Sequence, residues 1–400
     1  MRPSWMAVSL LLAACGGTPD LDVIETQTTP SKRSEIRPAA YEAGNEILIF
    51  AGNEGLVVNQ IPRAKYLDDT WLFEPGKGWT MVETETAPSA RARYAIAIDE
   101  EGGRALLFGG RWRQDGETGD YTLYNDLWEF DFGKREWTLL DDGRGGPAPR
   151  YYAQGAYDQA SGKFYIWGGN TNTDPLTFNI TQQLWSWDGT AWERITTTGD
   201  KPSRRSFLGS LHDTARNRLV IFGGQEGNFV SFAYNDAFAL DLESGEWMEL
   251  NGGATFAPST RMHAQMSYDS KLDRYLLFGG HTDFGDQNDL WQMDPETGAW
   301  SEVYFADVLL GGLGCLGNPS EVPATFVEQD LTAPERRHNA MTTVMHDSLW
   351  IFGGLHAECS DHLDDTWRYD LQTDTWIELI GATSGESCAR RSDDCQCLCL

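Results

Sequence analysis

A short apolar run that ends in glycine recurs six times along this chain, and no other feature limits the possible folds as strongly. Five of the copies end in Gly-Gly, and in the first copy Ala51 takes the place of the first glycine. The second glycines are Gly52, Gly110, Gly169, Gly224, Gly280 and Gly354, spaced by 55 to 59 residues until a last step of 74. A repeat of this length is one supersecondary unit that cannot bury its apolar face alone, so its copies must pack against one another.

Each copy carries further signals in a fixed order. A Pro and then an Arg precede the glycine pair, and an acidic or amide pair with an aromatic residue follows it, as at Asp126 and Trp128. A second Trp comes next, for example Trp137. The arginines are Arg33, Arg91, Arg150, Arg205, Arg261 and Arg337. Short turns rich in Asp and Gly separate these segments, which indicates four short strands in each copy.

This order of signals resembles the kelch repeat, and the resemblance covers roughly residues 30–380. A kelch repeat folds as one four-stranded blade, and the blades close into a ring. The resemblance therefore implies an all-β chain folded as a six-bladed β-propeller. The glycine pair is expected to adopt positive φ where a Cβ would clash, and the two aromatic positions are expected to fill the space between adjacent blades.

The strands of each blade are named A to D from the axis of the ring to its rim. Because consecutive strands are antiparallel, the B–C loops and the D–A crossings emerge on one face. We name this the long-loop face, since its B–C loops, such as 111–124, are long and irregular. Variable loops on a rigid scaffold commonly bind partners. This face is the predicted surface for a protein or for a small anionic or carbohydrate ligand.

The six arginines open the A strands and are expected to surround the channel mouth on the long-loop face. Arginine suits bidentate recognition of carboxylates, so the six are predicted to bind an anionic ligand. The alternative is that each arginine pairs with an aspartate of a neighbouring blade, such as Asp126 or Asp289, and locks the ring. The sequence leaves both roles open.

No catalytic residue, metal ligand or cofactor is predicted. The kelch resemblance includes galactose oxidase, a copper enzyme with a Tyr crosslinked to a Cys, but every Cys after residue 15 lies in a loop or the tail. A sugar-acid epimerase or mutarotase with its site at the channel mouth is the alternative to a binding module, although no acid–base pair stands out. Asp283, Asp286, Asn288 and Asp289 carry oxygens suited to Ca²⁺, but without EF-hand spacing a solvated acidic loop is the preferred interpretation.

The first residues resemble a bacterial lipoprotein signal. Residues 1–14 combine a basic start with an apolar stretch that is too short to span a bilayer as a helix. Cys15 follows Leu-Ala-Ala, as in a lipobox. We therefore expect lipidation of Cys15, a flexible tether over 15–29 and placement in the cell envelope at the outer membrane, with no other membrane contact. The formal net charge of −29 disfavours binding to nucleic acid.

Six cysteines are left after Cys15, and an even number in an oxidising compartment indicates disulfides. Cys315 lies in a predicted insertion over 303–333 between blades five and six, and Cys359 lies in a B–C loop on the same face. These two are expected to form a disulfide. The tail over 381–400 contains four more, for which two disulfides are favoured over a zinc site. They are Cys388, Cys395, Cys397 and Cys399.

Overall fold

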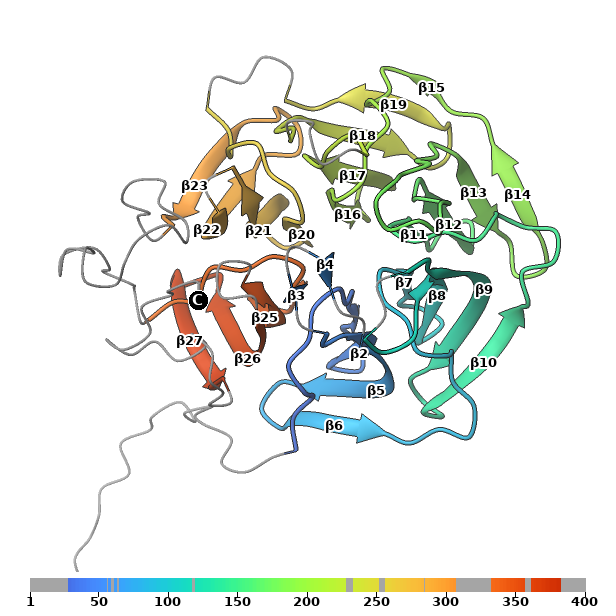
Figure 1. Cartoon of the computed structure of the whole chain (residues 1–400). Coiled ribbons are helices and arrows are strands. Elements are labelled where there is room, and N and C mark those ends of the chain that lie inside the picture. The colour runs from blue at the N-terminus through green and yellow to red at the C-terminus, as the bar shows by residue number, and fades with distance from the viewer. Residues whose placement is uncertain are drawn as a thin grey trace, which may run out of the picture.

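The computed structural model is an all-β ring of six blades (Figure 1), which confirms the predicted six-bladed propeller. It describes residues 28–382 except 56, 59–60, 63–64, 117–118, 228–232, 252–255, 284, 307–331 and 357–360. Each blade is built on four antiparallel strands that follow one another in the chain. A search of this described part found no helix with the length and apolar character needed to cross a membrane.

The first three blades occupy the blue and green part of the ring in Figure 1. Blade 1 comprises β1 (Ala39–Tyr41), β2 (Glu46–Asn53), β5 (Tyr66–Glu74) and β6 (Gly78–Val82). Blade 2 comprises β7 (Ala95–Asp99), β8 (Arg104–Trp112), β9 (Thr122–Asp131) and β10 (Glu136–Asp141). Blade 3 comprises β11 (Gln154–Asp158), β12 (Lys163–Trp167), β13 (Leu184–Trp187) and β14 (Trp192–Ile195). A small ribbon of β3 (Val57–Val58) and β4 (Ile61–Pro62) lies in the B–C loop of blade 1.

The other three blades complete the ring. Blade 4 comprises β16 (Gly209–Asp213), β17 (Arg218–Phe222), β18 (Ala237–Asp241) and β19 (Glu246–Glu249), with β15 (Thr198–Gly199) added in parallel at its outer edge. Blade 5 comprises β20 (Gln265–Asp269), β21 (Arg274–Thr282), β22 (Gly285–Met293) and β23 (Trp300–Tyr304). Blade 6 comprises β24 (Met341–Met345), β25 (Ser348–His356), β26 (Asp361–Asp370) and β27 (Thr375–Ile380).

Aromatic pairs fill the spaces between adjacent blades, as the sequence predicts. The Trp of each D strand packs against the aromatic residue that precedes the glycine pair in the previous blade, with ring centroids 4.7 to 5.7 Å apart. Rings at this separation add attraction beyond the area they bury. The pairs are Phe352–Trp79, Phe50–Trp137, Phe108–Trp192, Trp167–Trp247, Phe222–Trp300 and Phe278–Trp376.

The ring closes between blade 6 and blade 1 without exchange of a strand, since each of these blades comes from one continuous part of the chain. The two blades lie side by side in Figure 1, in red and blue. Trp79 of blade 1 donates its indole N–H to Thr366 of blade 6 at 3.0 Å. Trp137 makes the equivalent bond to Thr70, at 2.9 Å, between blades 2 and 1. The closing interface is therefore built from the same contacts as an internal one.

The glycine pair permits a close approach between neighbouring blades, which confirms the expectation from the sequence. Gly279 has a φ of 58°, and a Cβ placed on it would lie only 2.7 Å from the carbonyl oxygen of Arg337 in the next blade. The following residue, Gly280, donates its backbone N–H to that same carbonyl at 3.0 Å. An alanine at Gly279 would clash with a backbone atom that has no freedom to move away, because that atom is fixed by its hydrogen bond.

Candidate functional site

The six predicted arginines lie four to six residues before the A strands, and these residues are only 0 to 4% exposed. Arg261 illustrates the pattern. Its guanidinium donates two bonds to Asp289, at 2.7 and 2.8 Å, and others to the carbonyls of Gly279 and Ser259. Four other arginines make the same paired bonds to an aspartate. These pairs are Arg33–Asp69, Arg91–Asp126, Arg205–Asp236 and Arg337–Asp365.

The aspartate partner belongs to the arginine's own blade, and not to a neighbouring blade as the locking alternative assumed. The link between blades comes from the arginine backbone instead. The N–H of Arg261 donates to the carbonyl of Tyr234 in blade 4, and its carbonyl accepts from Gly224 of that blade. The arginine therefore joins two blades, through its backbone on one side and its side chain on the other. This geometry favours the locking role, and ligand binding by the whole set stays a prediction.

The two residues of the acidic or amide pair have separate tasks. Asp289, the second of its pair, also accepts the indole N–H of Trp291 at 2.7 Å. Asn288, the first, donates its side-chain N–H to the carbonyl of Pro334 in the following D–A crossing, at 3.0 Å. Both side chains are buried, so the interpretation of these residues as part of a solvated acidic loop is wrong. Calcium binding by this loop is therefore disfavoured, because Asp289 is hydrogen-bonded to Trp291 whereas Asn288 is hydrogen-bonded to the D–A crossing.

Blade 3 departs from the arginine–aspartate pattern. Gln183 occupies the aspartate position, so Arg150 has a neutral partner, with its Nη2 donating to Gln183 Oε1 at 3.2 Å. Burial, together with the smaller effect of the nearby charge of Arg194, lowers the pKa of Arg150 to about 10. Within the described residues, Arg150 is thus the ring arginine whose positive charge is opposed by another cation rather than balanced by a carboxylate.

A cavity of about 530 Å³ lies beside Arg150 on the long-loop face. Its walls come from the B–C loop of blade 3, from β14 and from the crossing into blade 4, and they include Arg194, Lys201 and Arg204. These three side chains are exposed, and no carboxylate is among the lining residues described. We name this the basic cavity. Its volume lies within the range of about 300–1,000 Å³ that is usual for ligand sites.

Six residues surround the axis at the start of the A strands, each two positions after a ring arginine. All six have positive φ, between 54° and 64°. Five backbone hydrogen bonds of 2.6 to 3.4 Å link them from blade to blade around the channel. They are Glu35, Arg93, Tyr152, Phe207, His263 and Asn339.

Glu35 is the charged centre of this axial ring. Its carboxylate accepts a hydrogen bond from Arg93 at 2.6 Å and contacts Arg111 at 3.2 Å. Burial alone would raise the pKa of Glu35, but the charges of Arg111 and Arg93 outweigh burial and lower the pKa to about 2. The small axial cavity here measures about 20 Å³, which is room for about one water molecule. This cavity is too small for a sugar acid, and no observation on the described residues supports the enzyme alternative.

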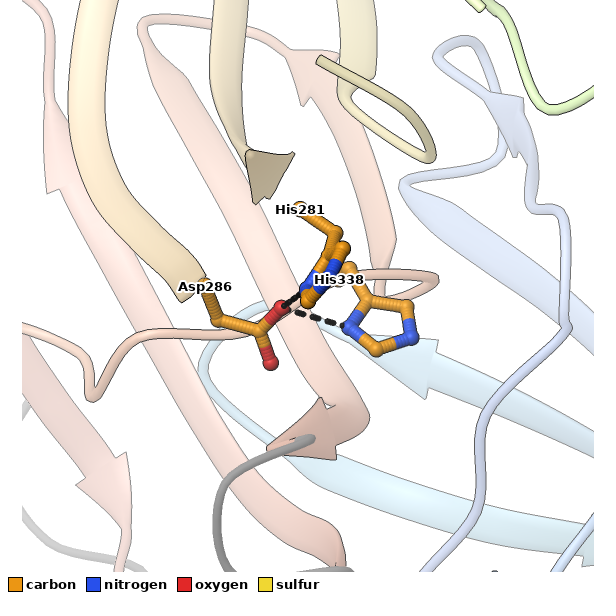
Figure 2. Close-up of side chains that lie close together, drawn as sticks. All are labelled: His281, Asp286 and His338. Atoms are coloured by element: carbon orange, nitrogen blue, oxygen red, sulfur yellow. Dashed lines mark hydrogen bonds and ion pairs between the residues drawn. The ribbon is translucent and has the colours of Figure 1, made fainter. Parts of the chain in front are cut away.

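A second polar cluster lies at the long-loop face between blades 5 and 6, where His281, Asp286 and His338 converge (Figure 2). Asp286 is fully buried. Burial would raise its pKa, but the adjacent His338 and His281 lower the pKa well below the usual value. Among the described residues, these three are the group suited to holding a metal ion. The sequence predicts no metal ligand, and this cluster departs from that prediction.

Several predictions from the sequence lie outside the described residues. Cys15 and the signal over 1–14 precede the first described residue, and the tail cysteines follow the last one. Cys315 and Cys359 fall in two undescribed internal segments, so their disulfide stays a prediction.

The basic cavity and the histidine cluster, which were not predicted, each have recognisable features in the sequence. Gln182-Gln183 stands where the other copies have Asn-Asp or Asp-Asp, and this departure marks the basic cavity. His281 and Asp286 are close in sequence, but His338 follows Asp286 by 52 residues. Only the contact between blades 5 and 6 brings His338 next to His281 and Asp286.

Comparisons with known proteins agree with this architecture. Residues 156–308 match the family model described as the KLHDC2/KLHL20/DRC7 Kelch-repeats domain, and residues 336–379 match the Kelch motif. The leucine-zipper-like transcriptional regulator 1 homolog of Drosophila melanogaster is 25% identical over 353 residues, which is 86% of this chain and 31% of the relative. The Kelch domain-containing protein 10 of Homo sapiens is 24% identical over 308 residues, covering 73% of this chain and 61% of the relative. The chain thus spans less than two thirds of the length of these relatives.

Proposed function

Because the chain belongs to the kelch-repeat family, we propose that it is an interaction module that binds a partner protein through its long-loop face. Kelch propellers commonly serve as protein-interaction modules. The observation that carries the proposal is the basic cavity on that face, where Arg194, Lys201 and Arg204 are exposed around a buried Arg150. Such a site fits an acidic segment of a partner, whose carboxylates arginine binds in paired hydrogen bonds.

The overall negative charge does not prevent recognition of an anion at this place. At physiological ionic strength the Debye length is about 8 Å, so distant acidic residues are largely screened. The cations that line the basic cavity act at contact distance. We therefore expect binding at this cavity to depend on local charge, and added salt should weaken it.

The first experiment reverses two charges in the basic cavity with Arg194→Glu and Arg204→Glu. The immobilised full chain is used to capture envelope proteins, and captured proteins are quantified by mass spectrometry against a resin without bait. We expect the partner enriched by the wild type to fall at least about tenfold with the double variant, since the loss of interfacial charge pairs costs a few kcal/mol.

The matched control makes the same change in net charge on the opposite face. Lys77→Glu and Lys134→Glu alter exposed side chains in the C–D turns of blades 1 and 2, and this variant should capture the partner as the wild type does. Equal loss in both variants would show a non-specific charge effect and overturn the assignment of the cavity. Retention of the partner by the cavity variant would overturn it as well.

We also propose that the propeller is anchored in the cell envelope through a lipid on Cys15. The support is the lipobox-like Leu-Ala-Ala-Cys order after a short apolar stretch. One acyl chain gives marginal membrane binding and two give a stable anchor. Cys15→Ser should therefore move the protein from the detergent phase to the aqueous phase in detergent partitioning. A Cys15→Ser protein that still partitions with detergent would contradict the anchor.

A further inference from the structure

Three side chains from two blades meet at the cluster between blades 5 and 6. His281 lies in β21 and Asp286 in β22, whereas His338 opens blade 6. The Nδ1 atoms of His281 and His338 lie 2.8 and 2.9 Å from the same oxygen of Asp286. Figure 2 shows both imidazole rings directed at this one oxygen. The three possible donor atoms all lie within 4.8 Å of one another.

These atoms are arranged as ligands of one ion would be. Zinc binds imidazole nitrogen and carboxylate oxygen at about 2.0–2.2 Å, so two ligands of the same ion lie about 3.0–3.5 Å apart. The two observed nitrogen–oxygen separations are within a few tenths of an ångström of that range. A small expansion of the cluster would therefore place an ion among the three atoms.

The fold itself does not need these residues at their positions. Asp286 pairs with His281 across the β21–β22 ladder, and the equivalent pair is Tyr66 with Asn53 in blade 1 and Leu123 with Arg111 in blade 2. Blades 1 and 2 thus form with an aromatic or an apolar residue where blade 5 has a buried carboxylate. Burying a carboxylate costs free energy unless it is paired or bound to a metal.

The two histidine positions are also used differently in other blades. Asn53, which is equivalent to His281, accepts backbone N–H bonds from Gly55 and Lys65 and so fixes its own loop. His281 instead directs its ring at Asp286. Ser34 occupies in blade 1 the position that His338 occupies in blade 6. The repeat does not fix the residue at any of these positions, and in blades 5 and 6 they bring three donor atoms to one spot.

We propose that His281, Asp286 and His338 bind a divalent transition-metal ion of the zinc class. Two imidazoles and one carboxylate are a donor set that such ions favour, and three protein ligands leave a position for water or for a group of a bound partner. The His281 side chain is 35% exposed while Asp286 is buried, so the site is reached from the long-loop face. The ion ties blade 5 to blade 6.

The test is a calorimetric titration of the full chain with ZnCl₂, after alkylation of any free thiols so that the cysteines cannot bind zinc. The wild type is expected to bind one ion. His281→Ala should weaken binding at least tenfold, because even residues that only orient a metal ligand cost about 10–100-fold when replaced. Asp286→Asn should give the same loss with almost no change in volume.

The control is His346→Ala, which removes an exposed histidine from the A–B turn of blade 6 and should leave zinc binding unchanged. Zinc should also raise the melting temperature of the wild type and of this control, but not of His281→Ala, since a ligand stabilises only the form that binds it. The absence of zinc binding by the alkylated wild type would overturn the proposal. Equal affinity in the wild type and the folded His281→Ala protein would do so too.

Discussion

Arg261→Met is expected to lower the free energy of unfolding by about 3–5 kcal/mol, whereas Arg150→Met should cost only about 1–3 kcal/mol. Removing Arg261 leaves the carboxylate of Asp289, which is 4% exposed, buried without a counter-charge. Removing Arg150 leaves only neutral groups, Gln183 and two backbone carbonyls, without their donor. It also relieves the repulsion from Arg194. Equilibrium unfolding in urea measures both values.

The double variant Arg261→Met with Asp289→Leu separates the charge effect from lost packing. Replacing both members of a buried ion pair is often close to neutral, so the double variant should regain much of the stability that the single variant loses. If Arg261→Met unfolds like the wild type, the arginines do not lock the blades. The role as an anion-binding ring would then regain support.

Glu35→Gln is expected to cost about 3 kcal/mol of unfolding free energy at pH 7. The pKa of Glu35 is lowered to about 2 from 4.5, and a shift of this size corresponds to that free energy. The amide would leave the buried Arg93 and Arg111 without the charge that balances them. Glu83→Gln, at an exposed position, is the matched control and should be close to neutral.

The effect of Glu35 should depend on pH in a defined direction. Because the pKa in the folded protein lies below the ordinary value, the stabilisation is fully present above about pH 5. It is lost as the pH falls toward 2. The gap between wild type and Glu35→Gln in urea unfolding should therefore be widest near neutral pH and shrink in acid. A gap that stays constant between pH 7 and pH 3 would contradict the charge role of Glu35.

The fold could be predicted because its signals repeat. Each blade contains the same glycine pair, arginine and tryptophans, so six weak local patterns combine into one strong one. Such a pattern does not show in which direction a long side chain points. The sequence placed the arginines correctly at the A strands but could not show that Arg91 reaches Asp126 within one blade. That choice follows from how the backbone of Arg91 sits against blade 1, with Gly52 donating to its carbonyl.

The candidate sites were harder to predict because they arise where the repeat fails. Gln183 is visible in the sequence as an exception, but the basic cavity also needs Lys201 and Arg204 from the crossing into blade 4. The metal cluster needs His338 beside Asp286, and that contact exists only because blades 5 and 6 are neighbours. Departures from the repeat are therefore the most informative positions in this chain for function, once the geometry shows which of them meet.

The contacts at the closing interface between blades 6 and 1 do not depend on which blade comes first in the chain. Trp79 and Phe352 meet there as Trp137 and Phe50 meet between blades 1 and 2. Because no strand is shared across the closing interface, a chain that began at any of the six blades would form the same ring. A circularly permuted chain that started at blade 2 or blade 5 would keep the crossing from blade 3 into blade 4 and would present the same long-loop face, the same basic cavity and the same histidine cluster.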